Sequence, residues 1–529
     1  MFTLTTFLAY TLFVALYAWY RLRKEKLGSQ DGYFLGGRSL TGIVIAGSML
    51  LTNISTEHLI GMNGSSYKNG FIVIGWEVTS ALALILAAVY FIPKYLKMGL
   101  TTIPQYLENR FDGMLRSYVA FFLMISFVIT LLPIVLYTGA INLESIFNIS
   151  EVLELPKDDA LLITVVVVGL IGSLYAILGG LKAVAVSDTI NGYGLLIGGL
   201  AVPLIALFSI GEGNISEGLT KVFSNAPKKF NVIGAKDSVL PFEVLFTGLI
   251  VNQIYFWCMN QTIIQRALGA KNLKEAQKGL LLTGLLKIFI PLVIILPGVI
   301  GFYYFGESLY QNQDMVYPEI IKKVLPASFV GIFAAIVMGA VLSTFNSVLN
   351  SAATIFSLDL YKRHFDSKVS DKRLVFVGKL TSSVLAIFAI AVAPFVAKAP
   401  DGLYQLLQQL NGIFFIPIAS IMLVGFFTKN ISAFAAKVAL FVGLIFYLLA
   451  SFVFDTGIHF VHIWGIEFIL NLVVMYLISY YYPNKKEFKI NDLKVVTMED
   501  WKYTKPFSIF LCAVTLIIYI TMGSINGLE

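Results

Sequence analysis

The chain alternates long apolar segments with short polar ones along all of its 529 residues. Fourteen segments are long and apolar enough to predict membrane-spanning helices, because about 20 apolar residues cross the hydrocarbon core of a bilayer. They lie at residues 2–21, 41–67, 71–93, 117–147, 160–179, 185–210, 240–264, 279–305, 327–360, 375–396, 403–427, 433–453, 459–482 and 505–525. The pattern predicts an all-α polytopic membrane protein in which residues 1–529 form one integral domain.

Composition agrees with this interpretation. Hydrophobic residues make up 57% of the chain and charged residues 13%, and the mean hydropathy of +0.81 excludes an ordinary soluble domain. The first apolar segment has no positively charged leader and no clear cleavage site, so we expect a retained helix. The two cysteines, Cys258 and Cys512, lie in apolar surroundings and predict no disulfide framework.

The formal charge of +7 does not indicate a nucleic-acid partner. Excess Lys and Arg in a membrane protein usually mark cytoplasmic loops. The basic residues gather in alternate loops, which places both termini outside a plasma membrane, or outside the cytoplasmic membrane of a bacterium. The loops predicted to be cytoplasmic include Lys94, Lys97, Arg110, Arg116, Arg266, Lys271, Lys274 and Lys278.

Residues 51–64, LTNISTEHLIGMNG, place polar side chains where a membrane helix should continue. A charged side chain at the bilayer centre costs roughly 2.5–3.5 kcal/mol on insertion scales, so such residues are functional candidates. Thr, Asn and Ser compete with the backbone for hydrogen bonds, which favours an interrupted helix with free carbonyl oxygens for a cation such as Na⁺. A kinked helix whose polar groups bond to neighbouring helices is the alternative. For Glu57 we expect a structural role, pairing with a neighbouring helix.

Four further polar features lie within apolar segments. Lys287 is at about mid-depth, which predicts a partner and a cavity rather than snorkelling. Glu77 follows Trp76 and is either an interfacial carboxylate or a site residue. Residues 339–361 repeat small polar side chains, which suit either close helix packing or cation binding. Three amides share one face of the eleventh segment: Gln405, Gln408 and Gln409.

Together these side chains suit a hydroxyl-rich solute beside a cation. They include no nucleophile–base pair and no Cys/His metal spacing, so we expect no enzyme. Two other classes stay open: an intramembrane enzyme that uses Glu57, His58 and Glu77 as acid and base, and a solute sensor or channel on a transporter fold.

The chain resembles the sodium:solute symporter family, and within it the sodium/sugar cotransporter branch. The resemblance rests on NISTEHLIGMNGSSY, LKAVAVSDTIN, NQTIIQRALGAKNLKEAQKG, LKIFIPLVIILPG and NSVLNSAATIFSLDLY. It implies a LeuT-like core of five helices repeated with inverted topology. Residues 2–21 would form a leading helix, about 41–210 the first repeat, about 240–427 the second, and about 433–525 peripheral C-terminal helices.

The resemblance also implies site residues. The main Na⁺ site would use Leu51, Ile54, Ala340, Ser343 and Thr344. A possible second Na⁺ site would use Asp188, Asn346 and Ser347. The substrate contacts would be His58, Glu77, Gln253, Lys287 and Gln408. The gates would be Met62, Trp76, Tyr137, Phe256, Trp257 and Tyr404.

The expected activity is Na⁺-driven import of a neutral hexose such as galactose or glucose. Myo-inositol, another polyol or an organic anion such as sialic acid are the alternatives within the family. Residues 117–147 contain no Lys or Arg, although sialic-acid members are expected to place an arginine there. Gln253 and Phe256 depart from the family pattern. The expected partners are the solute, Na⁺ and the lipid bilayer, with no nucleic acid and an open oligomeric state.

Overall fold

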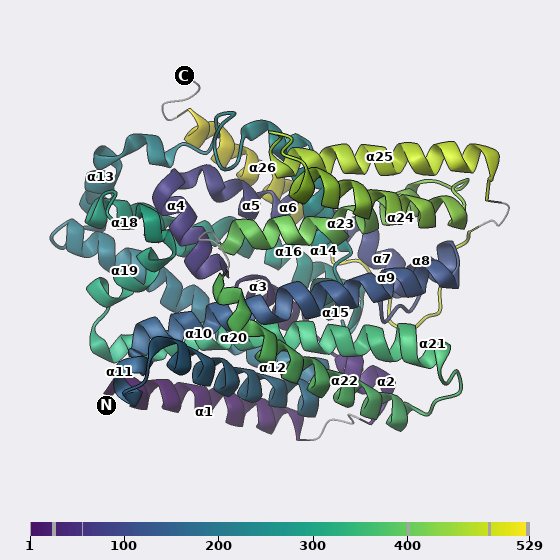
Figure 1. Cartoon of the computed structure of the whole chain (residues 1–529), viewed down its shortest axis with the longest axis horizontal. Helices are drawn as coiled ribbons and strands as arrows, with labels where there is room; N and C mark the ends of the chain where they lie inside the picture. The colour runs from purple at the N-terminus through teal and green to yellow at the C-terminus, as the bar shows by residue number, and fades with distance from the viewer. Residues whose placement is uncertain (1, 24–27, 56, 399–402, 485–487, 525–529) are drawn as a thin grey trace.

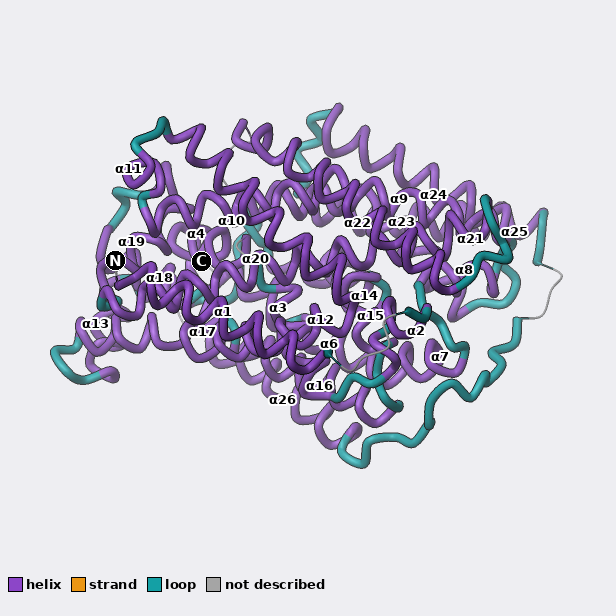
Figure 2. The backbone as a smooth tube through the Cα atoms, turned by 90° about the horizontal axis from the view of Figure 1, so that it is seen from below, coloured by secondary structure: helices purple, strands orange, loops and turns teal. Residues whose placement is uncertain are grey.

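A computed structural model describes residues 2–23, 28–55, 57–398, 403–484 and 488–524. Within these ranges the protein is helical and has no β-strand, as Figure 2 shows. Two isolated bridges, Leu40–Ala270 and Asn272–Thr497, join backbone segments that are far apart in the sequence. The predicted all-α fold is confirmed.

Most helices follow one another along the chain with short connections, and longer connections precede α14 and α26 (Figure 1). The first half contains α1 (Phe2–Leu22), α2 (Gln30–Phe34), α3 (Gly42–Asn53), α4 (Asn63–Asn69), α5 (Gly75–Val78), α6 (Ser80–Leu86), α7 (Ile92–Lys97), α8 (Ile103–Arg110), α9 (Gly113–Ser126), α10 (Leu132–Phe147), α11 (Ile149–Leu153), α12 (Lys157–Ile210) and α13 (Ile215–Asn225). The second half contains α14 (Gly248–Cys258), α15 (Gln261–Leu268), α16 (Leu273–Phe289), α17 (Pro291–Ile294), α18 (Leu296–Phe305), α19 (Val316–Val324), α20 (Ala327–Ile355), α21 (Lys362–His364), α22 (Asp371–Val392), α23 (Leu403–Phe427), α24 (Ala433–Leu448), α25 (Phe460–Tyr481) and α26 (Thr504–Gly523).

Each of the fourteen predicted segments is helical over most of its described length. In the described ranges, nine helices are long and apolar enough to cross a membrane, or ten if the bent pair Leu273–Phe289 and Pro291–Phe305 forms one span. The number of crossings therefore stays a prediction. The fifth and sixth segments are the two arms of α12, which turns at Gly180 with a φ of 57°. A Cβ at Gly180 would lie 2.4 Å from the carbonyl oxygen of Tyr33, so this bend requires glycine.

Two helices are interrupted near the centre of the protein. Helix α3 ends at Asn53, and Ile54 is extended, with a φ of −90° and a ψ of 94°. Residue 56 lies outside the described ranges, and a π-helical stretch over Glu57–Met62 then leads into α4. The second break separates α14 from α15, where the side chain of Asn260 accepts a hydrogen bond from the backbone of Thr262 at 2.9 Å. The predicted interruption of residues 51–64 is confirmed.

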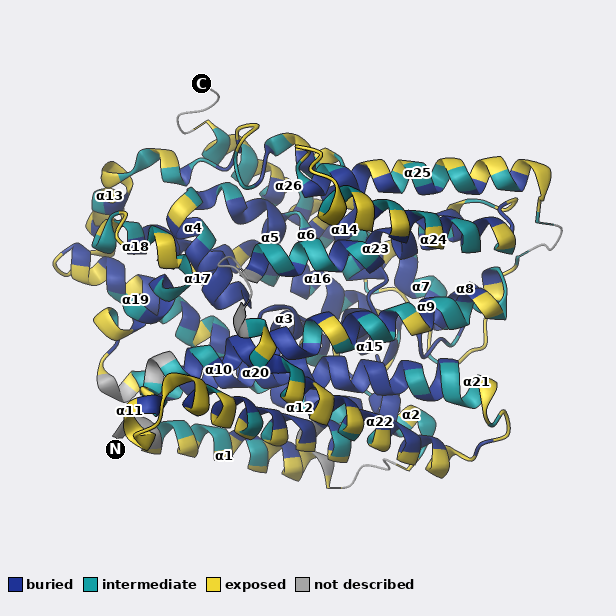
Figure 3. Ribbon diagram, viewed as in Figure 1, coloured by how far each residue is buried: buried dark blue, intermediate teal, exposed yellow. Residues whose placement is uncertain are grey.

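Burial divides the bundle into a core and an apolar outer surface (Figure 3). Helix α20 lies at the centre and is almost entirely buried. Helices α1, α12, α25 and α26 expose large apolar side chains, such as Ile509 and Ile520, each 70% exposed. Apolar side chains around a helical bundle face lipid in a membrane protein, which agrees with the multi-pass prediction.

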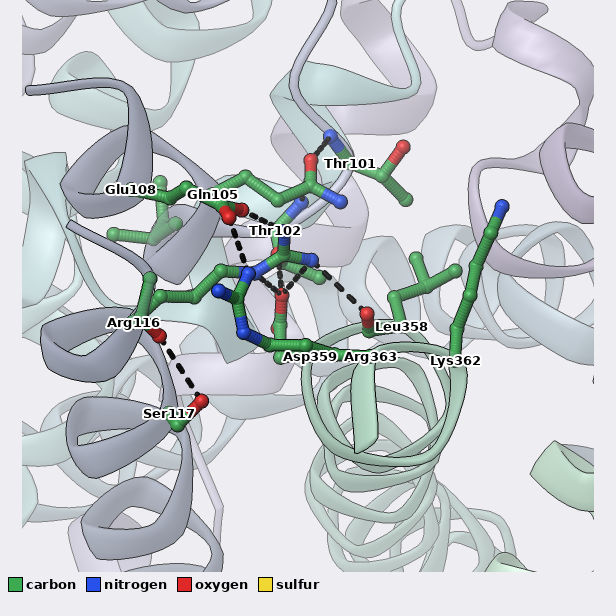
Figure 4. Close-up of polar contacts among 12 residues, drawn as sticks. Thr101, Thr102, Gln105, Glu108, Arg116, Ser117, Leu358, Asp359, Lys362 and Arg363 are labelled. Atoms are coloured by element: carbon green, nitrogen blue, oxygen red, sulfur yellow. Dashed lines mark hydrogen bonds and ion pairs between the residues drawn. The ribbon is translucent and has the colours of Figure 1, made fainter. Parts of the chain in front are cut away.

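A charged network joins α8 and α9 to α21 and to the π-helical stretch Phe356–Tyr361 that follows α20 (Figure 4). Arg116 Nε donates to Asp359 Oδ1 at 2.7 Å, and Thr102 Oγ1 donates to the same oxygen at 2.9 Å. Glu108 accepts hydrogen bonds from both Arg116 and Arg363. Partial burial raises the pKa of Glu108, but the hydrogen bonds from Arg363 and Arg116 outweigh it, so the pKa lies below its usual value.

Candidate functional site

A cavity with about 720 Å³ of empty space lies beside both helix breaks. It is lined by polar and aromatic side chains from α3, α5, α14, α16, α20 and α23. The structure brings all five predicted substrate residues to this cavity, together with four of the predicted gate residues. The lining is Thr52, Asn53, Glu57, His58, Trp76, Glu77, Ser80, Leu131, Asn252, Gln253, Phe256, Trp257, Asn260, Thr262, Lys287, Thr344, Val348, Tyr404, Leu407, Gln408, Asn411 and Phe415.

Lys287 and Glu77 form a buried ion pair in the wall of the cavity. Each side chain is 1% exposed, and their ammonium and carboxylate groups are hydrogen-bonded. Asn53 Oδ1, at the end of α3, accepts a second hydrogen bond from Lys287 Nζ at 2.6 Å. Lys287 thus has the partner that its depth predicts, and Glu77 is not an interfacial carboxylate.

Gln253 organises two aromatic side chains. Its Nε2 donates to the carbonyl oxygen of Trp76 at 2.7 Å and to Thr79 Oγ1 at 3.0 Å. Its Oε1 accepts from Ser80 Oγ at 3.0 Å and from Trp257 Nε1 at 3.1 Å. Because the amide makes four hydrogen bonds to protein, we infer that Gln253 positions the two tryptophans in addition to any contact with a solute.

His58, Tyr404 and Trp76 form an aromatic group on another part of the wall. The ring centroids of His58 and Tyr404 are 5.2 Å apart, and those of Trp76 and Tyr404 are 5.9 Å apart, both in edge-to-face geometry. Gln408 Nε2 donates to the hydroxyl of Tyr404 at 3.1 Å. His58 Nδ1 is buried without a hydrogen bond to any described residue. The wall therefore combines aromatic faces with an available ring nitrogen and an amide oxygen.

The charge of the lining is close to neutral. It carries two carboxylates, Glu57 and Glu77, and one ammonium, Lys287. For Glu57 we expect a structural role, pairing with a neighbouring helix, and this stays a prediction. Its side chain lines the cavity and accepts a hydrogen bond from Ser55 Oγ.

The residues predicted for the main Na⁺ site lie where α20 crosses the end of α3. Thr344 Oγ1 donates to the carbonyl oxygen of Thr52 at 3.1 Å, which joins the two helices. Ser343 is buried, and its hydroxyl interacts with the carboxylate of Asp188. The predicted carbonyl positions, Leu51 and Ile54, flank Thr52 on the α3 side, and Ala340 precedes Ser343 by one turn. The chemistry is a set of hydroxyl and carbonyl oxygens, which suits a hard monovalent cation.

The region predicted for a second Na⁺ site contains a guanidinium group. Arg266 of α15 is fully buried, donates to Ser48 Oγ at 3.1 Å, and is also bonded to Ser347. Its Nη2 lies 3.7 Å from Asp188 Oδ2, which in turn accepts from Ser48 Oγ at 2.8 Å. Asp188 and Ser347 are thus brought together around Arg266. Asn346 instead lines a separate cavity of about 380 Å³ against α1.

Comparisons with known proteins decide the family. The family model described as the sodium:solute symporter family matches residues 33–446. The chain belongs to that family. A sodium/glucose cotransporter of Vibrio parahaemolyticus is 32% identical to the symporter over 81% of each chain. An Escherichia coli protein described as "Uncharacterized symporter YidK" is 43% identical over 99% of this chain and 91% of its own length.

More distant relatives extend the comparison. The bovine sodium/myo-inositol cotransporter is 28% identical over 80% of this chain, which spans 62% of that relative. A solved Na⁺-coupled sialic acid symporter matches the fold with a TM-score of 0.78 at 22% identity, covering 93% of this chain and 99% of that one. The protein is therefore a multi-pass membrane transporter rather than an enzyme, and Na⁺ is its coupling ion.

The structure also adds residues to the predicted site. Asn53, Asn252 and Asn411 line the cavity of the symporter. Of these three, only Asn53 was marked by the sequence pattern, because it lies in the polar stretch at the helix break. Arg266 was predicted to lie in a cytoplasmic loop; in the structure it belongs to α15 and is fully buried. Met62 and Tyr137, predicted as gate residues, are buried outside the lining of the cavity.

Proposed function

We propose that the symporter imports a neutral hexose, galactose or glucose, together with Na⁺ by alternating access. The observation that carries this proposal is the charge of the cavity. Among its described lining residues Lys287 is the one cation with a fixed charge, and it is already bound to Glu77 and Asn53. Glu77 neutralises the charge of this ammonium and leaves at most one N–H for a solute, so the cavity favours a neutral solute over an anion.

The groups that remain suit a sugar. The amide of Gln408 and the imidazole of His58 offer hydrogen bonds to hydroxyl groups, and the rings of Phe256 and Trp257 offer apolar faces for a pyranose. We assign the substrate contacts to His58, Glu77, Gln253, Lys287 and Gln408, and the main Na⁺ site to Leu51, Ile54, Ala340, Ser343 and Thr344. We also propose inverted repeats over about 41–210 and 240–427.

We further propose that one Na⁺ accompanies each solute. The guanidinium of Arg266 lies between Asp188 and Ser347 and supplies the positive charge that a second Na⁺ would bring. One Na⁺ crossing a potential of 100 mV releases roughly 2.3 kcal/mol, and a tenfold gradient adds about 1.4 kcal/mol. That energy supports roughly 500-fold accumulation of a neutral solute.

Uptake into proteoliposomes tests the proposal. With an inward Na⁺ gradient we expect accumulation of labelled galactose or glucose that K⁺ cannot replace, and none of sialic acid. Gln408→Ala should abolish uptake. Gln405→Ala is the matched control, since Gln405 lies on the same helix outside the lining. Normal uptake by Gln408→Ala, or Na⁺-driven uptake of sialic acid, would refute the assignment.

The same charge balance favours myo-inositol as a second candidate, because it is also a neutral polyol. The named activity of the mammalian relatives adds support. Myo-inositol uptake without hexose uptake would select it.

A further inference from the structure

A second intramembrane acid lies outside the cavity, among helices α23, α24 and α25. These three helices pack against one another, as Figure 1 shows for α24 and α25. Glu467 of α25 is fully buried, and neither of its carboxylate oxygens has a hydrogen-bond partner among the described residues. An ionisable residue inside a membrane span is rare and is a functional candidate by default.

The helices around Glu467 provide no counter-ion. Helices α14 and α23, which pack against α25, contain no charged residue. Helix α24 contains one, Lys437, and its ammonium is bound to Asp112 at 2.8 Å. The phenol of Tyr447 on α24 acts electrostatically on Glu467, and His462 of α25 is hydrogen-bonded to the side chain of Thr247 at 3.1 Å. A negative charge on Glu467 would therefore be buried without compensation, which is far less favourable than the neutral acid.

A second buried acceptor without a partner lies on the same helix as Glu467. Asn471 lies one turn after Glu467 on the same face of α25, and its Oδ1 also has no partner among the described groups. Its Nδ2 donates to Ser420 Oγ of α23 at 3.4 Å. A Cβ on Gly443 of α24 would lie 2.7 Å from both Oδ1 and Nδ2 of Asn471 and 3.0 Å from Glu467 Oε1. The absence of a side chain at Gly443 thus lets both side chains approach the same point of α24, where a hydrogen shared between their oxygens would satisfy both acceptors.

We propose that Glu467 and Asn471 form a proton-binding site. The Glu467 carboxyl holds a proton and donates it in a hydrogen bond to Asn471 Oδ1, which satisfies both buried groups at once. We assign a proton rather than Na⁺ because the described contacts place the side-chain oxygens of Glu467, Asn471 and Ser420 there, fewer than the roughly six that a hard cation takes.

The site lies behind the helix that carries part of the solute cavity. Tyr447 of α24 donates its hydroxyl hydrogen to the carbonyl oxygen of Gln409 of α23 at 2.9 Å. Gln408, which lines the solute cavity, immediately precedes Gln409. Loss of the proton would place an uncompensated charge among these helices and loosen their packing on α23. Proton release at alkaline pH is therefore expected to lower uptake.

Infrared difference spectroscopy on the full-length protein tests the site without any solute. Its result therefore does not depend on which substrate the symporter carries. At neutral pH, subtracting the Glu467→Gln spectrum from wild type should reveal the carbonyl stretch of one protonated carboxylic acid. The control Glu151→Gln, at an exposed residue, should remove no such band. A carboxylate band in its place, or one that depends on Na⁺, would overturn the proposal.

Two further measurements complete the test. The variant Asn471→Leu can be measured even if Glu467→Gln fails to fold. It should shift the carbonyl stretch of the protonated Glu467 to the frequency of an acid with a weaker hydrogen bond, and an unchanged frequency would overturn the role of Asn471. In proteoliposomes, Na⁺-driven uptake by wild type should fall severalfold from neutral to alkaline pH, while Glu467→Gln should hold its rate. A parallel alkaline loss in both proteins would overturn the link to transport.

Discussion

The ion pair between Lys287 and Glu77 gives the sharpest stability prediction. Exposed ion pairs contribute about 0–1 kcal/mol, but both of these side chains are 1% exposed. Removing one partner of a buried pair typically costs about 3–5 kcal/mol, because the other charge stays buried and unpaired. Glu77→Gln leaves Lys287 its bond to Asn53 Oδ1 at 2.6 Å, so we expect about 3 kcal/mol. Lys287→Met leaves the buried Glu77 carboxylate without its ammonium partner, and the His58 ring at 3.8 Å is too far away for a hydrogen bond to replace it, so we expect a loss nearer 5 kcal/mol.

The double variant separates charge from packing. If the loss comes from an unpaired charge, the double variant Glu77→Gln with Lys287→Met should lose less unfolding free energy than the two single variants added together. We expect the difference to be about 2 kcal/mol or more. Chemical unfolding of the purified protein in detergent, followed by tryptophan fluorescence, measures all three variants under one condition. Losses below about 1 kcal/mol for both single variants, or strictly additive losses, would refute the interpretation of a desolvated pair.

Three other predictions follow from different contacts. Ser343→Ala should raise the Na⁺ concentration for half-maximal uptake about tenfold, which corresponds to roughly 1.4 kcal/mol, because it removes one of the oxygen ligands of the proposed Na⁺ site; an unchanged Na⁺ dependence in an uptake titration would exclude this serine. Arg266→Met should destabilise the protein by about 3–5 kcal/mol by leaving Asp188 unpaired, and adding Asp188→Asn should restore most of that loss in the same unfolding assay. Because the pKa of Glu108 is lowered in the folded protein, its contribution to stability is complete above about pH 4.3, the ordinary value for Glu, and is lost as pH falls through the folded pKa. Glu108→Gln should flatten that acidic part of the stability curve, and an identical acid profile would contradict the role of the Arg116 and Arg363 contacts.

The sequence could predict those features that depend on local pattern. Hydropathy locates the helices because each span needs its own apolar residues, and the polar run at 51–64 marks the break because those residues oppose a continuous helix locally. The same reasoning could not predict the position of Arg266. It comes shortly before the basic stretch that contains Lys271, Lys274 and Lys278, like a residue of a cytoplasmic loop, and only the packing of α15 against α3 and α20 reveals that it is buried. Glu467 escaped prediction for a related reason. One acid in an otherwise apolar segment has no partner within reach along the chain, so its environment depends on α23 and α24.

The break after α3 suggests how cation and solute binding are coupled. Thr52 is bound to α20 twice, because its carbonyl oxygen accepts from Thr344 at 3.1 Å and its hydroxyl lies 3.0 Å from the hydroxyl of Ser347. The next residue, Asn53, is bound to Lys287 in the wall of the solute cavity. Contacts near the proposed Na⁺ site and contacts at the proposed solute site therefore act on two consecutive residues of one interrupted helix. A cation bound to the proposed carbonyl ligands Leu51 and Ile54 would restrict Thr52 and Asn53 between them, and Asn53 would then orient Lys287 before the solute arrives. Binding the solute second then requires less ordering, which is the thermodynamic condition for positive coupling between the two sites.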